Sequence, residues 1–342
     1  MKKLLMLASA ASLAAFPLSA QEAKTYPAPG EIVVAAKASE WVAIAPSDLL
    51  VMDLAPHPTG KVRRVVIQLM PAPFSQSWVG NIRKLAAAKF WDSTSINRVQ
   101  DNYVVQWGDA TEKKALPVGL AVVPESEYIV ADLLKSNRHV LDAVGAGNAN
   151  REKIATEQNR LNVPKGSPKA TTVDSGIPRA YRSRDPYSHA QGHYRGWPVA
   201  LRRNDLTPVH CYGMVGVGRN LSPDTGTGAE LYTVIGHAPR HLDRNIALVG
   251  RVIEGIEHLS SLPRGTGTLG FYEKEEERTP ILSVRLGNEV AALQPFEYLS
   301  TESTSFAAYA DARANRRDPF FIQPAGGADI CNIPVPVRRK GK

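Results

Sequence analysis

The fold of this chain is decided by residues 65–109, which read VVIQLMPAPFSQSWVGNIRKLAAAKFWDSTSINRVQDNYVVQWGD. The run at 65–69 is β-branched and apolar and is followed by Pro71, so it predicts a strand that ends there. Apolar residues then recur at helical spacing over 75–89, and 96–107 again has the composition of a strand. Arg98 is the one arginine inside this otherwise strand-like segment. Without further context, an exposed strand arginine would be the simpler interpretation.

Two separated blocks of the sequence carry signature motifs. Residues 96–99 read Ile-Asn-Arg-Val and residues 103–109 read Tyr-Val-Val-Gln-Trp-Gly-Asp, while 227–232 read Thr-Gly-Ala-Glu-Leu-Tyr and similar matches follow at 241–243 and 249–255. The first block resembles the Phe-His-Arg-Val and Gln-Gly-Gly-Asp signature of the cyclophilins, a family of prolyl isomerases, and the second resembles that family's Asn-Gly-Ser-Gln-Phe-Phe. Both blocks occur in the family's order, although together they cover less than half of the chain.

The resemblance implies a mainly β fold, namely a closed antiparallel β-barrel capped by two helices, with an irregular insertion and terminal extensions. The expected organisation is a signal peptide at 1–20, an N-terminal extension at 21–48, a barrel at 49–262 interrupted by an insertion at about 110–196, and a C-terminal extension at 263–342. Helical patterns are also expected at 141–162, within the insertion, and at 306–316.

The function implied by the resemblance is peptidyl-prolyl cis-trans isomerisation, which requires rotation of an X-Pro bond and no covalent chemistry. Arg98, Gln106 and Tyr103 match the catalytic positions. Those that match the proline-binding groove are Val104, Met214, Glu230, Tyr232, His241 and Leu242. The alternative is a cyclophilin-like peptide-binding module or chaperone in which catalysis is vestigial. The expected partners are proline-containing polypeptides in either case.

Several positions depart from the family pattern. Asn97 replaces the usual histidine beside the arginine, Ile246 replaces a histidine near the groove, and Glu230 replaces a glutamine. A carboxylate so close to a guanidinium should attract it, so we expect an ion pair between Glu230 and Arg98, with a lowered Glu230 pKa and weakened catalysis.

The N-terminus predicts export. Lys2 and Lys3 precede an apolar run at 4–18 that ends in small residues, which is the layout of a secretory signal peptide. The mature chain is then expected to begin near Gln21 and to be periplasmic. A buried N-terminal helix is the weaker alternative, and the chain has no later stretch apolar enough for stable membrane insertion.

Composition and cysteines narrow the function further. Removing Lys2 and Lys3 leaves a formal net charge of +6, with the basic residues spread along the chain and not interleaved with aromatics, so nucleic-acid binding is not expected. An oxidising compartment would allow Cys211 and Cys331 to form a disulfide, with two unpaired thiols as the alternative. His189 and His193 are spaced like a metal pair but lie in a loop, so no metal and no cofactor are expected.

Overall fold

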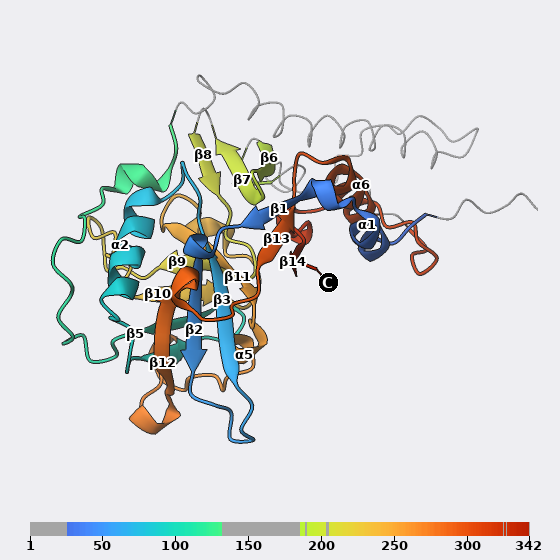
Figure 1. Ribbon diagram of the computed structural model, residues 1–342. Helices are drawn as coiled ribbons and strands as arrows, with labels where there is room; N and C mark the ends of the chain where they lie inside the picture. The colour runs from blue at the N-terminus through green and yellow to red at the C-terminus, as the bar shows by residue number, and fades with distance from the viewer. Residues whose placement is uncertain are drawn as a thin grey trace, which may run out of the picture.

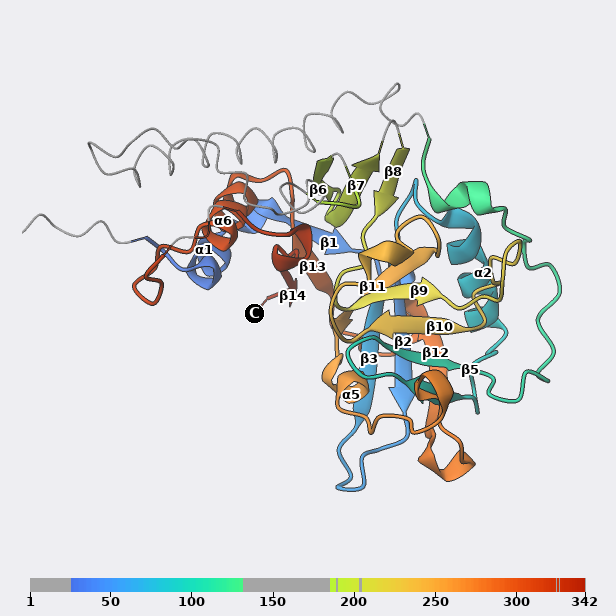
Figure 2. The same ribbon diagram turned by 180° about the vertical axis from the view of Figure 1, so that it is seen from behind.

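The computed structural model describes residues 26–131, 185–188, 190–202, 205–323, 325 and 327–341. At its centre lies a closed eight-stranded barrel in which all strand pairs are antiparallel, which confirms the predicted fold class (Figures 1 and 2). In spatial order the barrel strands are β10 (Leu231–Val234), β5 (Val104–Gly108), β4 (Ser95–Val99), β12 (Thr279–Leu286), β2 (Leu49–Leu54), β3 (Arg63–Leu69), β11 (Leu248–Glu254) and β9 (Met214–Val217), which pairs again with β10.

The strand that closes the barrel, β12, lies beyond the boundary that the sequence suggested. It pairs with β2 over Ile281–Leu286 and with β4 at Thr279 and Pro280. Without it, β2 and β4 would each present a row of unpaired backbone groups at an open edge. The expected end of the barrel at residue 262 is therefore too early, and 279–286 belongs to the barrel.

The main helix of the barrel, α2 (Gln76–Ala87), was predicted at 75–89. Trp78, Ile82 and Leu85 recur on one helical face and are fully buried, so the helix packs this face into the barrel core. The second barrel helix, α5 (Glu257–Ser260), is a single turn after β11 that contacts β3.

Residues 190–202 and 205–208 form a separate antiparallel sheet beside the barrel. Its strands are β6 (Ala190–Tyr194), β7 (Trp197–Arg202) and β8 (Asp205–Pro208). The buried Arg251 of β11 ties this sheet to the barrel: Nη1 donates to the Gly196 carbonyl (2.7 Å), and Nε and Nη2 donate to Gln68 Oε1 (2.9 and 2.7 Å). The predicted helix at 141–162 lies outside the described residues.

The segments at the two ends of the described chain pack against each other. A sheet joins β1 (Trp41–Ile44), β13 (Phe296–Leu299) and β14 (Val337–Arg339), and it lies beside α1 (Pro29–Ala35) and α6 (Thr304–Ala314), as Figure 1 shows. Their shared apolar cluster includes Trp41, Leu299, Phe306, Tyr309 and Ile333. The expected signal peptide and mature start at Gln21 lie outside the described residues, and no helix within the described part has the length and hydrophobicity to cross a bilayer.

A disulfide connects the C-terminal segment to the barrel. Cys211, in the turn between β8 and β9, is bonded to Cys331, which lies 120 residues later. Because the bond closes a long loop, it restricts the unfolded chain far more than the folded one.

We expect loss of this disulfide to destabilise the protein by about 4–5 kcal/mol, which is the chain-entropy value for a loop of this length. The measurement is urea unfolding of the Cys211→Ser/Cys331→Ser variant against the oxidised wild type. Reduced wild type is the control and should match the variant. Equal unfolding midpoints for all three samples would show that the bond does not stabilise the fold.

Candidate active site

Four residues form one row across neighbouring barrel strands. Arg98 of β4 lies opposite Gln106 of β5, Gln106 lies opposite Tyr232 of β10, and Tyr232 lies opposite Gly216 of β9. Directly opposed residues project from the same face of a sheet, so the register alone places these side chains side by side. Gly216 leaves space for its neighbour, because a Cβ there would lie 2.3 Å from the Tyr232 ring.

A β-bulge in β4 gives Arg98 its place in this row. Ile96 pairs with Trp107 and Arg98 pairs with Gln106, so Asn97 is an extra residue without a partner of its own in the ladder. Such bulges change which side chains reach a given face of a sheet. Without the bulge, the residue after Ile96 would face Gln106, and that residue is Asn97.

Three acceptors and two aromatic rings hold the Arg98 guanidinium. Nε donates to the carbonyl of Leu269 (2.7 Å), Nη1 donates to Gln106 Oε1 (3.1 Å), and Nη2 donates to Gln100 Oε1. The guanidinium carbon lies 5.8 Å from the centre of the Tyr103 ring and 5.3 Å from that of Phe271. Arginine has five N–H groups, so two remain available beyond these described contacts.

An apolar cluster lies beside the guanidinium. Val104, Tyr232 and Val234 form a buried cluster against which Tyr103 and Ile246 pack. The alternating residues Val105, Trp107 and Leu231 point the other way, into the barrel core, as the two-residue period of a strand requires.

The structure brings together most of the residues expected in the groove. Arg98, Gln106, Tyr103, Val104 and Tyr232 adjoin one another. His241 is exposed and its ring is parallel to that of Tyr103, at 6.5 Å. Leu242, the next residue, is half-buried. Met214 is 4% exposed and packs with the main core, but it lies two residues before Gly216 in β9 and so projects from the same face as the row.

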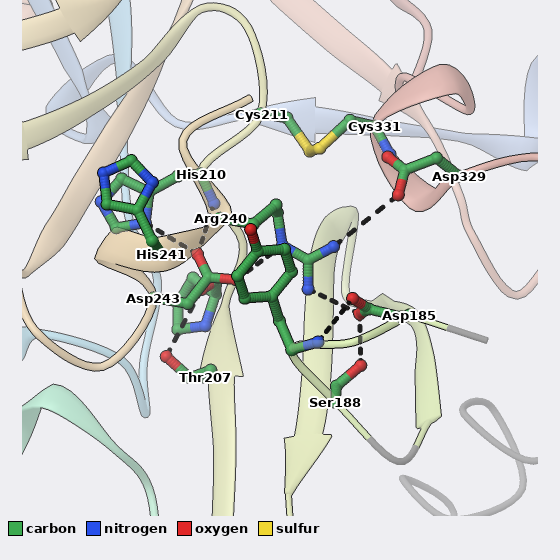
Figure 3. Close-up of polar contacts among 12 residues, drawn as sticks. Asp185, Ser188, Thr207, His210, Cys211, Arg240, His241, Asp243, Asp329 and Cys331 are labelled. Atoms are coloured by element: carbon green, nitrogen blue, oxygen red, sulfur yellow. Dashed lines mark hydrogen bonds and ion pairs between the residues drawn. A yellow bond between two sulfur atoms is a disulfide. The ribbon is translucent and has the colours of Figure 1, made fainter. Parts of the chain in front are cut away.

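A buried polar chain supports the Tyr232 hydroxyl. His210 Nε2 lies 2.9 Å from Tyr232 Oη, and His210 Nδ1 lies 2.8 Å from Asp243 Oδ1. Because the carboxylate accepts from Nδ1–H, a neutral His210 has Nε2 free to accept from the tyrosine. Burial acts to raise the pKa of Asp243, but His210 and Arg240 outweigh it and the pKa lies below its ordinary value. Figure 3 shows His210, Asp243 and Arg240 joined in this chain.

Glu230 does not form the ion pair with Arg98 that the sequence suggested. Its Oε2 accepts from Gln106 Nε2 (3.3 Å), and its carboxylate lies over Gly108, where a Cβ would be 1.9 Å from Oε1. Burial raises the Glu230 pKa from 4.5 to about 7, and hydrogen bonds from Gln106 and Asn97 offset this only in part. The expected lowering of this pKa is therefore wrong, because Gln106 lies between the two charges and burial is the larger effect.

Sequence reasoning missed two parts of the site. One is the loop that carries Leu269 and Phe271, where the resemblance to the family ends. The sequence signal for this loop was the run of glycines at 265, 267 and 270. The structure requires glycine at position 270, because its φ is +82° and a Cβ there would lie 2.7 Å from Gln100 Cα. The other is His210, which could have been sought because a buried tyrosine hydroxyl needs a hydrogen-bond partner.

Only one of the two histidines considered for zinc lies within the described residues. His189 lies outside the described residues, and His193 Nε2 is 3.0 Å from the Ile333 carbonyl oxygen. Within the described ranges, no group of three or more histidine, cysteine or acidic side chains could hold a metal ion.

Comparison with protein families agrees with the barrel fold. Residues 59–286 match the family model described as cyclophilin type peptidyl-prolyl cis-trans isomerase/CLD. The chain belongs to the cyclophilin family. None of the curated proteins compared with it matches its sequence.

Two solved cyclophilin structures match the chain to different extents. A cyclophilin from Hirschia baltica is 18% identical, with a TM-score of 0.57, and the match covers 88% of this chain and 95% of that one. A cyclophilin-type isomerase from Cryptosporidium parvum, determined in the presence of the dipeptide Ala-Pro, is 10% identical with a TM-score of 0.33, covering 69% and 98%. The Hirschia baltica structure shares the fold over most of this chain.

The raised pKa makes folding stability depend on Glu230 and pH. The folded state favours the protonated form of Glu230. The contribution of this protonation to folding stability is fully present below pH 4.5 and is lost as the pH rises through about 7. We therefore expect Glu230→Gln to raise the free energy of unfolding by roughly 1–3 kcal/mol at pH 8 and by little at pH 4.5, relative to wild type.

Urea unfolding at both pH values measures this difference. Glu276→Gln, at an exposed glutamate outside the site, is the matched control and should give no pH-dependent difference. The charges that act on Glu230 include Glu112 and Asp109, both of which raise its pKa. A Glu230→Gln variant that is less stable than wild type at pH 8 would contradict a raised pKa.

Proposed function

We propose that this cyclophilin is an active peptidyl-prolyl isomerase in which Arg98 stabilises the twisted X-Pro amide. The observation that carries the proposal is the placement of the Arg98 guanidinium beside the apolar cluster of Val104, Tyr232 and Val234. A proline ring resting on this surface would have its nitrogen within reach of the remaining N–H groups of Arg98.

The chemistry needs little more than this arrangement. Rotation about the X-Pro bond breaks amide conjugation, with a barrier of roughly 18–20 kcal/mol, and the lone pair then localises on the proline nitrogen. A donor that binds this nitrogen more tightly in the twisted state than in the planar state lowers the barrier. Arg98 suits the role because it stays charged and its fork is fixed by Gln106, Gln100 and Leu269 before substrate binds.

The proposed substrates are proline-containing segments of polypeptides that fold after export. Support for export is the signal-peptide pattern at 1–20, and the disulfide between Cys211 and Cys331 suits an oxidising compartment such as the periplasm. The row from Arg98 to Tyr232 uses only side chains of the barrel itself, so the proposed reaction requires no cofactor.

A peptide-binding module with vestigial catalysis is the second candidate, and one observation favours it. Gln106, which should hold the substrate backbone, is engaged on both sides: Oε1 accepts from Arg98 and Nε2 donates to Glu230. Substrate must displace at least one of these contacts. Binding of proline peptides without any acceleration of their isomerisation would favour this second function.

For the isomerase, we expect Arg98→Ala to lower kcat/KM on a short proline peptide by about 100-fold or more, the usual cost of removing a donor that acts in the transition state. Arg98→Lys should not restore activity, because an ammonium cannot reproduce the fork that three acceptors hold. The measurement is the rate of cis-to-trans conversion of the peptide under matched conditions.

The matched control is Arg83→Ala, which removes a partly exposed arginine of α2 that pairs with Asp48. This control should keep wild-type activity, and circular dichroism should show that all variants are folded. Equal rates for wild type and Arg98→Ala would refute the catalytic role of Arg98.

A further inference from the structure

A pocket of about 370 Å³ adjoins the proposed proline-binding surface. Tyr103 and His241 belong to its wall, so the pocket and the groove share these two rings. The rest of the wall includes Asp185 and Tyr187 from the segment before β6, Arg240 from the loop after β10, and Asp329 from the C-terminal segment. We call this site the acidic pocket. The disulfide holds Asp329 in place, since Cys331 lies two residues away (Figure 3).

The acidic pocket has more negative than positive charge. Arg240 is only 5% exposed and is surrounded by three carboxylates: its Nε lies 2.6 Å from Asp243, its Nη2 lies 2.7 Å from Asp185, and its Nη1 lies 3.8 Å from Asp329. The pocket wall itself has two of these carboxylates, Asp185 and Asp329, against the single guanidinium of Arg240. Figure 3 shows the guanidinium between these carboxylates.

One of the three carboxylates is open to a ligand. Asp185 and Asp243 are buried and hydrogen-bonded to Arg240, whereas Asp329 is 47% exposed. Asp329 Oδ1 accepts from the amide of Cys331 (2.8 Å), but the 3.8 Å between its Oδ2 and Arg240 Nη1 is too long for a hydrogen bond. Arg240 Nη1 is itself buried without a hydrogen-bond partner among the described residues. A donor entering the pocket can therefore bind Asp329 Oδ2.

The rings on the pocket wall suit the stem of a basic side chain. Tyr187 is 40% exposed, and Tyr103 and His241 present parallel ring faces. Lysine and arginine place their methylene stems along apolar surface while the charged end seeks an acceptor, and their cations are attracted to aromatic faces. An acidic side chain would instead meet the excess negative charge.

We propose that the acidic pocket is a subsite for a lysine or arginine side chain of the substrate, one or two residues from the proline. This inference rests on the proposed function for the groove, because Tyr103 is what connects the two sites. Residues of an extended chain advance by about 3.3 Å each, so a side chain near the proline can reach a pocket that shares a wall with the groove. The isomerase is thereby selective for basic segments.

The test compares proline peptides that carry lysine, alanine or glutamate at each of the two positions on either side of the proline. We expect kcat/KM for the lysine peptide to exceed that for the alanine peptide by about three- to five-fold at one of these positions and low ionic strength, with glutamate below alanine. The lysine-to-alanine ratio should fall as salt is added.

Asp329→Asn keeps the acceptor for the Cys331 amide but removes the charge, so it should bring the lysine-to-alanine ratio close to one. Asp48→Asn is the matched control, since Asp48 is similarly exposed (49%) and does not line the pocket, and it should keep the wild-type ratio. Dissociation constants of the same peptides, measured by fluorescence anisotropy, provide a readout that does not depend on catalysis.

The outcomes separate this inference from the proposed function. Isomerisation with a lysine-to-alanine ratio near one at every position, in rates and in dissociation constants, overturns the subsite and leaves the isomerase standing. No isomerisation of any peptide overturns the isomerase, and the ratio of dissociation constants then decides the subsite. A lysine-to-alanine ratio that stays at the wild-type value in Asp329→Asn also overturns the proposed subsite.

Discussion

The strand register of the barrel is the constraint on which the site depends. Arg98, Gln106, Tyr232 and Gly216 come from four strands that span more than a hundred residues, and they meet because β4, β5, β10 and β9 are neighbours with a fixed pairing. A slip by one residue in any pair would turn the side chains of that strand to the other face. Closure by β12 supports this register, because it joins β4 to β2 and leaves no free edge at that point.

A buried arginine, Arg251, connects the small sheet of β6, β7 and β8 to the barrel. Arg251 joins β11 to the β6–β7 hairpin, and its described hydrogen-bond partners, Gln68 and Gly196, are neutral. Burial lowers the pKa of Arg251 to about 10, because the protein interior disfavours the charged guanidinium. Its guanidinium also lies 4.5 Å from the centre of the Trp197 ring. If the Gln68 or Gly196 acceptor were moved away, the buried guanidinium would lose its hydrogen bonds. These contacts therefore favour the observed arrangement of the two sheets.

The polar and charged groups around the groove form two chains of contacts that meet at Tyr232. Glu230, Gln106 and Arg98 form a chain on one side, in which the Gln106 amide lies between the carboxylate and the guanidinium. Tyr232, His210, Asp243 and Arg240 form a second chain beneath the apolar surface, and this one continues to Asp185 and Asp329. Tyr232 is where the second chain reaches the first, because its ring lies in the row and its hydroxyl is bound by His210. Residues outside the minimal barrel are thereby connected to the floor of the groove.

The sequence by itself determined the fold class through its family motifs, the strand at 65–69 and the helix at 75–89 through local periodicity, and Arg98, Gln106 and Tyr232 as candidate site residues. It read 96–107 as one strand-like segment, whereas the structure has two strands there, β4 and β5. It could not determine that β12 closes the barrel, since strand pairing across the chain leaves no local pattern. It also assigned a lowered pKa to Glu230, whereas burial raises that pKa. Only the tertiary structure decided these points and brought Asp185, Arg240 and Asp329 together, because burial and charge proximity depend on which distant segments become neighbours.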